Sequence, residues 1–168
     1  MIKNINFLFV TFLGLGTIRY APGTVTSLIT AIFLYSSFHI LNLSNIVIFI
    51  TLLLIFIYSF YAVSYYIKDA SNKDPKEVVI DEVIGQSIPI YLYEITHGTT
   101  KGSQEDILFY FYIFLLFRFF DIKKPFPVSY FDKNFKNSFG VIFDDVIAGF
   151  YVVLTLMVFI IIKSKFFS

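Results

Sequence analysis

The chain alternates long apolar runs with short polar segments that carry most of its charge. Two of the runs, Asn45 to Tyr66 and Val146 to Ile162, contain no charged residue. A helix needs about twenty mainly apolar residues to cross the hydrocarbon core of a bilayer, and a lysine such as Lys163 can extend from its end to the interface. Both runs therefore predict membrane-spanning helices.

Three weaker runs accompany these two. Val25 to Leu41 is long enough to span but contains Thr and Ser, whereas Val83 to Tyr93 and Ile107 to Phe120 are short for a full crossing. We expect the two short runs to be tilted or packed partly inside a bundle. The polar residues between Leu41 and Asn45 predict a tight turn between two helices.

The N-terminal stretch from Ile5 to Leu15 has the apolar character of a signal-peptide core behind Lys3. No cleavage site of the small-x-small type follows it, so cleavage is the less favoured alternative. We interpret the stretch as a short amphiphilic or re-entrant helix that leads into a glycine-rich turn.

Composition sets the class of protein. With 168 residues, 57% of them apolar and 15% charged, and a mean hydropathy of +0.77, the chain is too apolar for an ordinary soluble domain. We expect a single domain over residues 1–168, an all-α integral membrane bundle of about five to six helices. The absence of cysteine excludes disulfides, thiolate metal sites and a cysteine nucleophile. The net charge of +1 points to no partner, and neither a nucleic acid nor a protein partner is predicted.

The charges are distributed unequally between the two ends of the predicted helices. Threading the apolar runs through a bilayer places nine of the thirteen basic residues and nine of the twelve acids on one side. Because basic loops remain inside, this side is predicted to face the cytoplasm. Its basic residues are Arg19, Lys68, Lys73, Lys76, Arg118, Lys123, Lys124, Lys133 and Lys136, against Lys101, Lys163 and Lys165 on the other side, and Lys3 is assigned to neither.

Two pairs of adjacent acids lie inside apolar helical sequence on the predicted cytoplasmic side. They are Asp81-Glu82 and Asp144-Asp145. Buried carboxylates without compensation are costly, and a hard divalent cation, above all Mg²⁺, compensates them through oxygen ligands. Adjacent helical residues point about 100° apart, so we expect only one acid of each pair to face a shared ion. The alternative for the first pair is favourable placement at a helix N-terminus.

A third polar cluster follows the run that ends at Phe120. Arg118 and Asp121 are three residues apart and share a helix face, while Pro125 forces Lys124 out of helical geometry and predicts the end of the helix. Arg and Lys beside a carboxylate cluster favour phosphate binding. A structural ion pair with interfacial lysines is the alternative.

The segment from Gly14 to Thr24 is a loop that ends where a helix is predicted to begin. Its small residues, Gly23 and Thr24 among them, would expose backbone amides to an anion at the helix N-terminus. The segment completes neither a dinucleotide fingerprint nor a phosphate-binding loop, and a plain turn is an equal alternative.

Histidine chemistry is disfavoured because His39 and His97 are predicted to lie far from the acids. Water activated by a metal ion, or an aspartate nucleophile, remains as the source of nucleophilic attack.

These motifs together resemble the bacterial phosphatidylglycerophosphatase A family. The resemblance is carried, in order along most of the chain, by Ala21-Pro22-Gly23-Thr24 with Ser27, Asp81-Glu82-x-x-Gly85, Phe117-Arg118-x-x-Asp121-x-x-Lys124-Pro125-x-Pro127 and Gly140-x-x-x-Asp144-Asp145-x-x-Ala148-Gly149. Phe126 replaces a Trp that many relatives have, Ser138-Phe139 replaces a glycine-rich lead, and Arg19 lies outside the shared pattern.

The resemblance implies a compact helical bundle in the bacterial inner membrane that removes the terminal phosphate of phosphatidylglycerophosphate, an anionic phospholipid, in a Mg²⁺-dependent reaction. We expect the metal ligands to be Asp81, Glu82, Asp144 and Asp145, the phosphate-binding groups to be Arg118, Lys124, Gly23 and Thr24, and the catalytic residues to be Asp121 and Asp145. Asp121 would orient Arg118 or act as a base. An ion or solute transporter and a non-catalytic lipid-binding protein are the alternatives.

Overall fold

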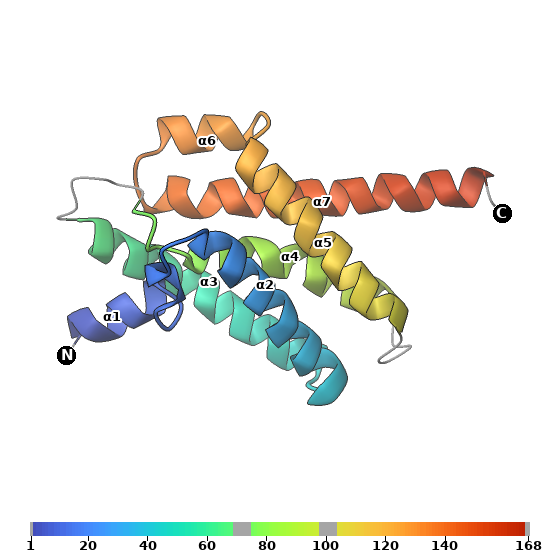
Figure 1. Cartoon of the computed structure of the whole chain (residues 1–168), viewed down its shortest axis with the longest axis horizontal. Helices are drawn as coiled ribbons and strands as arrows, with labels where there is room; N and C mark the ends of the chain where they lie inside the picture. Colours follow the sequence, from blue (N-terminus) through green and yellow to red (C-terminus); the bar gives the residue numbers. More distant parts are fainter. Residues whose placement is uncertain (1, 69–74, 98–103, 167–168) are drawn as a thin grey trace.

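Helices account for all the regular structure in the part of the chain that the computed structural model describes, residues 2–68, 75–97 and 104–166 (Figure 1). This confirms the all-α prediction. The described residues form α1 (Ile2–Val10), α2 (Pro22–Tyr35), α3 (Asn45–Ile67), α4 (Ile80–His97), α5 (Gln104–Lys123), α6 (Val128–Asn134) and α7 (Ser138–Phe166), with a 3-10 turn at Leu15–Thr17 and a π turn at Ser36–Ile40.

The helix count exceeds the predicted five to six because of α6, a helix of 7 residues. The short N-terminal helix α1 lies where an amphiphilic or re-entrant helix was predicted, although it begins earlier. The charge count above also includes Asp69, Lys73, Asp74 and Lys101, which lie outside the described residues, as do the side chains of His97 and Lys163.

Within the described residues, three helical segments are long and apolar enough to cross a membrane: Pro22–Ile40, Asn45–Ile67 and Ser138–Ile162. The second and third contain the two clear predicted spans, and the first covers the weaker one up to Ile40, one residue short of its predicted end at Leu41. Large apolar side chains such as Leu54 and Ile161 remain exposed on them, as a lipid-facing surface requires. Helices α4 and α5 extend beyond their short apolar runs at both ends, and the added turns contain charged residues such as Asp81 and Glu94 in α4 and Glu105 and Lys123 in α5.

Local sequence explains where the helices begin and end. Pro22 occupies the first turn of α2, where a missing N–H costs nothing, and the Ser44 hydroxyl caps α3 by accepting from the N–H of Val47 at 3.4 Å. Segment α5 ends at Lys123, and Lys124 adopts a positive φ of 43° before Pro125. The predicted end of this helix is confirmed.

Helix α4 lies against α2, α3, α5 and α7, and its closest partner is α7. At their crossing, a Cβ atom on Gly85 would lie 2.6 Å from the carbonyl oxygen of Asp145, and one on Gly149 would lie 2.5 Å from that of Gly85. Only glycine allows the two backbones to approach so closely. Asp81 and Asp145 each precede one of these glycines by four residues, so each acid lies one helical turn from the contact, on the same face.

Polar contacts at Glu94 fasten the C-terminal end of α4 to neighbouring segments. Glu94 lies twelve residues, or about 18 Å of helix, beyond Glu82. Its carboxylate is 2.9 Å from Nε2 of His39 and accepts a hydrogen bond of 2.9 Å from the Tyr110 hydroxyl. Glu94 of α4 thus joins the π turn after α2, through His39, to α5, through Tyr110, and His39 lies far from the acid pairs, as predicted.

Replacement of Gly85 by Ala is expected to lower the free energy of unfolding by about 1–3 kcal/mol, because the added Cβ meets backbone and the ring of Phe117. Helix propensity alone would act in the opposite direction by about 1 kcal/mol. Thermal unfolding of the detergent-purified protein measures the net sign. Ile95→Ala, an exposed site on the same helix, is the control, and a Gly85→Ala variant with a raised Tm would contradict the close crossing.

Candidate active site

A polar cavity of about 440 Å³ lies where α2, α4 and α7 begin and α5 ends. The motifs on these elements are far apart in the sequence and meet here because the helices cross at this end. All nine residues predicted for the site line the cavity: Gly23, Thr24, Asp81, Glu82, Arg118, Asp121, Lys124, Asp144 and Asp145. Arg19 and Lys76 line it as well.

Three of the four paired acids form a cluster. Asp81, Glu82 and Asp145 each contribute a carboxylate oxygen, and these oxygens all lie within 4.8 Å of one another. The expectation that only one acid of each pair could face a shared position is wrong for the first pair, because the longer side chain of Glu82 reaches the same point as that of Asp81. For the second pair the expectation agrees with the structure, because only Asp145 joins the cluster and Asp144 contacts Lys124 instead.

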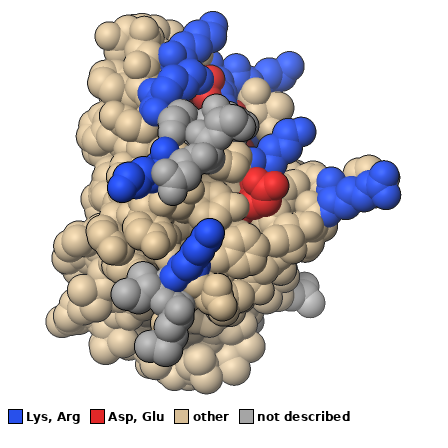
Figure 2. Space-filling view, turned by 90° about the vertical axis from the view of Figure 1, so that its left-hand side faces the viewer, with Lys and Arg blue, Asp and Glu red and all other residues tan. Residues whose placement is uncertain are grey.

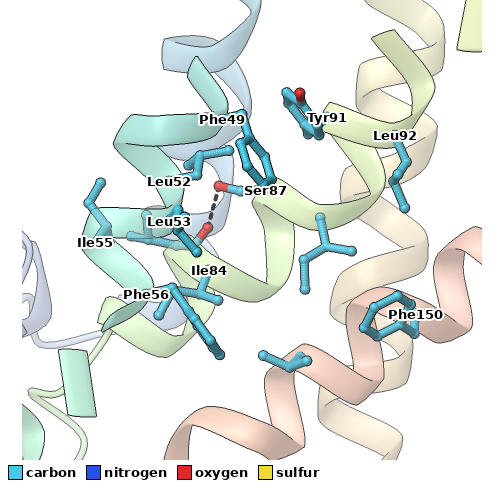
Figure 3. Close-up of a pocket in the computed structure, with 13 residues that line it drawn as sticks. Phe49, Leu52, Leu53, Ile55, Phe56, Ile84, Ser87, Tyr91, Leu92 and Phe150 are labelled. Carbon is cyan, nitrogen blue, oxygen red and sulfur yellow. Dashed lines mark hydrogen bonds between the residues drawn. The ribbon is translucent and has the colours of Figure 1, made fainter. Parts of the chain in front are cut away.

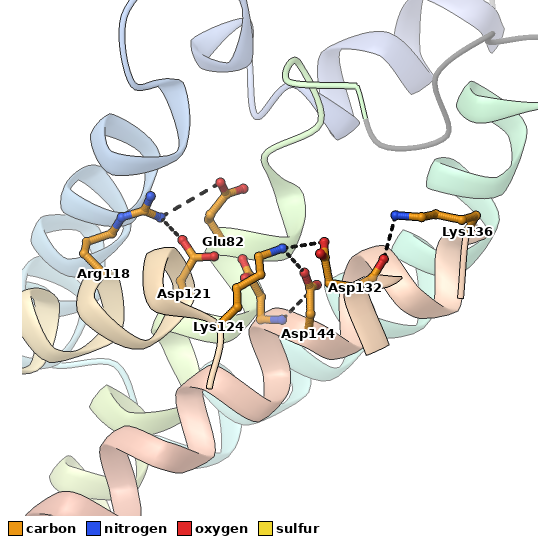
Figure 4. A network of polar contacts seen from close by, with 8 residues as sticks. Glu82, Arg118, Asp121, Lys124, Asp132, Lys136 and Asp144 are labelled. Atoms are coloured by element: carbon orange, nitrogen blue, oxygen red, sulfur yellow. Dashed lines mark hydrogen bonds and ion pairs between the residues drawn. The ribbon is translucent and has the colours of Figure 1, made fainter. Parts of the chain in front are cut away.

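Arg118 connects this cluster to α2 and α5. Its Nη1 lies 2.6 Å from Oδ2 of Asp121 and 4.0 Å from Oε1 of Glu82 (Figure 4). It also donates a hydrogen bond of 3.3 Å to the Ser27 hydroxyl, and that hydroxyl donates to the carbonyl of Gly23 at 2.8 Å. The guanidinium is thus fixed at the edge of the cavity by a carboxylate and a hydroxyl.

Lys124 lies between two carboxylates, at 2.7 Å from Oδ1 of Asp132 and 2.6 Å from Oδ2 of Asp144 (Figure 4). Burial by itself would lower the pKa of Lys124, but the two carboxylates outweigh it and raise the pKa above its usual range. The other oxygen of Asp144 accepts from the N–H of Asp145 at 3.0 Å. Asp144 is therefore engaged by Lys124 and stands outside the three-acid cluster.

The start of α2 forms the remaining wall. A Cβ atom on Gly23 would collide with Oε1 of Glu82, so a larger residue there would displace the Glu82 carboxylate from its place in the acid cluster. The amides of Gly23 and Thr24 lie in the first turn of α2, where backbone N–H groups have no acceptor within the helix. Such a turn favours a bound anion.

The acid cluster is compensated incompletely. Burial raises the pKa of Glu82 to about 7, and its Oε2 is buried without a hydrogen-bond partner among the described residues. An unpaired carboxylate oxygen beside two further carboxylates fits a hard divalent cation, which prefers oxygen ligands. Asp81, Glu82 and Asp145 are the residues that could hold such an ion.

The sequence was compared with known protein families and curated proteins. A sequence model of the family described as phosphatidylglycerophosphatase A matches residues 8–160, a range that contains every residue of the cavity. The chain belongs to the phosphatidylglycerophosphatase A family. The resemblance recognised from its motifs is thereby confirmed.

Individual members of the phosphatidylglycerophosphatase A family show the same relationship. The chain is 34% identical to a phosphatidylglycerophosphatase A of Haemophilus influenzae over 92% of its own length and 87% of the relative's. It is 29% identical to the Escherichia coli phosphatidylglycerophosphatase A over 49% of the chain and 42% of the relative. A Bacteroides thetaiotaomicron protein, 31% identical over 84% of each chain, is provisionally named a phosphatidylinositol-3-phosphatase. No solved structure matches the chain.

The contact between Lys124 and Asp132 was not predicted from the sequence. Asp132 lies on α6, which was not predicted, and no motif marks it. The only signal was its position among the charges of the predicted cytoplasmic side, eight residues after Lys124. Figure 2 views the end of the molecule that carries α6 and shows the Lys and Arg side chains gathered mainly over its upper part, with little acidic surface between them.

Replacement of Lys124 by Gln is expected to lower the free energy of unfolding by about 1–2 kcal/mol, because the largely buried Asp144 loses its cation. The partial exposure of Lys124 keeps the effect below that of a fully buried pair. Lys123→Gln, at the adjacent exposed lysine, should stay within about 0.5 kcal/mol of the wild type. Denaturant titration in detergent measures both, and equal effects at the two positions would argue against the contact.

Proposed function

We propose that the cavity hydrolyses the terminal phosphate of phosphatidylglycerophosphate and yields phosphatidylglycerol and inorganic phosphate. The observation that carries the proposal is the meeting of a three-carboxylate cluster with two fixed cations, Arg118 and Lys124, in one cavity of a phosphatidylglycerophosphatase A family member. A relative named for this activity shares 34% identity over 92% of the chain.

The phosphate would be bound by Arg118, by Lys124 and by the amides at the start of α2. Arg118 supplies a planar fork of donors, and its 2.6 Å contact with Asp121 holds that fork in one orientation. Asp121 thus acts as a positioning residue for Arg118. Lys124 supplies a point charge that stays protonated because two carboxylates flank it.

Asp81, Glu82 and Asp145 would hold Mg²⁺. The bound ion would offset the charge of the phosphate and help to generate the nucleophile from water. In the hydrolysis, the water oxygen forms the new bond to phosphorus, the bond from phosphorus to the glycerol oxygen breaks, and a proton passes to that oxygen as it leaves. Asp145, the acid nearest the glycine crossing on α7, is the carboxylate on which we expect turnover to depend most.

The site would lie at the cytoplasmic face of the bacterial inner membrane. Support comes from the three apolar helices and from the described basic residues Arg19, Lys68, Lys76, Arg118, Lys123, Lys124, Lys133 and Lys136, which follow the rule that basic segments remain inside. A transporter would distribute its acids along the membrane depth. In the described residues the acids of the cavity instead gather at the ends of the helices, which favours an enzyme.

The proposal is tested by release of inorganic phosphate from phosphatidylglycerophosphate in mixed micelles, with Mg²⁺ or with EDTA. We expect release that requires Mg²⁺, and a loss of at least about 100-fold in Asp145→Asn, since one ligand of the ion is removed. Glu77→Gln, an exposed acid outside the cavity lining, is the matched control and should retain wild-type rates.

Two results would count against the proposal. Release that persists in EDTA would exclude the metal role, and an Asp145→Asn variant with normal turnover would exclude the acid cluster. Phosphatidylinositol-3-phosphate serves as a second substrate, because one relative carries the name of that activity. Faster release from this lipid would reassign the head group.

The affinity for Mg²⁺ should depend on pH because the pKa of Glu82 lies at about 7, raised chiefly by burial. Protons compete with the ion below this value, so the affinity should rise about tenfold from pH 6 to pH 8. The stability of the cation-free protein should change in the opposite direction. A carboxyl with a pKa raised in the folded state favours folding at low pH, and this contribution is lost as the pH rises through about 7.

Isothermal titration calorimetry with Mg²⁺ at pH 6, 7 and 8 measures the first effect, and thermal unfolding in EDTA over the same range measures the second. The calorimetry should also detect proton release on binding when buffers of different ionisation enthalpy are compared. An affinity that stays constant from pH 6 to pH 8 would show that Glu82 does not bind the ion.

A further inference from the structure

A second cavity, apolar in lining and about 380 Å³ in volume, lies between α3, α4 and α7 (Figure 3). Its walls are formed by side chains such as Leu53 and Phe56 of α3, Ile84 and Ile88 of α4, and Phe150 of α7. Two of these helices, α3 and α7, contain predicted membrane spans, so the groove lies where hydrocarbon surrounds the protein.

The lining offers no polar group to an occupant. Its two hydroxyls are already bonded within the protein: Ser87 donates to the carbonyl of Val83 at 2.6 Å, drawn as the dashed line in Figure 3, and Tyr91 donates to the carbonyl of Asn45 at 3.3 Å. A head group or a peptide backbone would lose its hydrogen bonds to water there without replacement. The occupant must therefore be a hydrocarbon.

Along both α4 and α7, one end of the groove comes within one residue of the acid cluster. Val83 and Val146 line it, and these residues directly follow Glu82 and Asp145 in the sequence. From Val83 the groove follows α4 to Leu92, a distance of about 14 Å at the helical rise per residue. A molecule whose polar end enters the acid-lined cavity and whose apolar end follows α4 would occupy both cavities together.

We propose that this groove binds one acyl chain of the phosphorylated lipid whose head group is hydrolysed. The inference rests on the proposed function for the identity of the head group. A helix of a partner protein does not fit, because a helix is about 10 Å wide and the walls formed by α3 and α4 are themselves in contact. An acyl chain is the hydrocarbon that comes covalently attached to the phosphate.

The groove thereby gives the enzyme its preference for a membrane lipid over a soluble phosphate ester. Binding energy from a chain remote from the phosphate would hold the ester near the acids, and a substrate without that chain would lose it. We therefore expect the diacyl substrate to have a lower KM than a soluble phosphate ester without the chain.

Leu53→Trp and Leu54→Trp form a matched pair for the test. Both leucines are exposed on α3, but only Leu53 lines the groove. The measured quantity is the ratio of kcat/KM for a long-chain diacyl phosphatidylglycerophosphate to that for a water-soluble short-chain analogue with the same head group. We expect this ratio to fall about tenfold in Leu53→Trp, equivalent to about 1.4 kcal/mol, and to stay unchanged in Leu54→Trp. An equal change in both variants, or an unchanged ratio in Leu53→Trp, overturns the proposal.

A second measurement does not depend on turnover. A phosphatidylglycerophosphate with a photoreactive group along one acyl chain is irradiated with the full-length wild-type protein, and the labelled residues are identified by mass spectrometry. Labelling of groove residues that is competed by unlabelled phosphatidylglycerophosphate, and not by phosphatidylglycerol with the same chains, supports the proposal. Labelling competed equally by both lipids indicates ordinary membrane lipid and overturns it. Competed labelling without phosphate release would reject the proposed function and retain the groove as a lipid site.

Discussion

The close crossing of α4 and α7 is the constraint on which the rest of the site depends. At Gly85 and Gly149 the two backbones lie so close together that a Cβ atom on either residue would overlap a carbonyl oxygen of the other helix. The acids Asp81 and Asp145 lie one helical turn away on the same faces. The repeated spacing of acid and glycine on both helices converts one packing contact into a carboxylate cluster. Glycine is required here for proximity, since both positions lie in regular helix.

The electrostatics of the cavity follow from that crossing. Acids in the N-terminal parts of α4 and α7 bring negative charge together. Two cations at the C-terminal end of α5 offset part of it: Arg118 pairs with Asp121, and Lys124, the residue after the helix, pairs with Asp144. More carboxylates than cations line the cavity, and the surplus is concentrated at Asp81, Glu82 and Asp145. Such a site is suited to bind a metal cation at the acids, and the bound cation then favours binding of a phosphate beside it.

Sequence reasoning succeeded where one residue type determines local structure. The uncharged runs predicted α3 and the second half of α7, and Pro125 predicted the end of α5, because hydrocarbon and the proline ring act locally. It could not predict which carboxylates lie close together, since the position of each side chain depends on how whole helices cross. The contact between Lys124 and Asp132 likewise depends on α6, whose 7 residues carry too little apolar periodicity to be recognised.

Helix α3 has no charged residue over its 23 residues. Polar contacts fasten α4 at both ends: Arg118 of α5 lies near Glu82, and His39 of the π turn and Tyr110 of α5 contact Glu94. Helix α3 is instead held against α4 and α7 mainly by apolar contacts. Such contacts have no preferred direction, so they allow α3 to shift along its neighbours. A molecule that entered sideways from the bilayer past α3 would therefore displace mainly apolar contacts, and few hydrogen bonds would have to break.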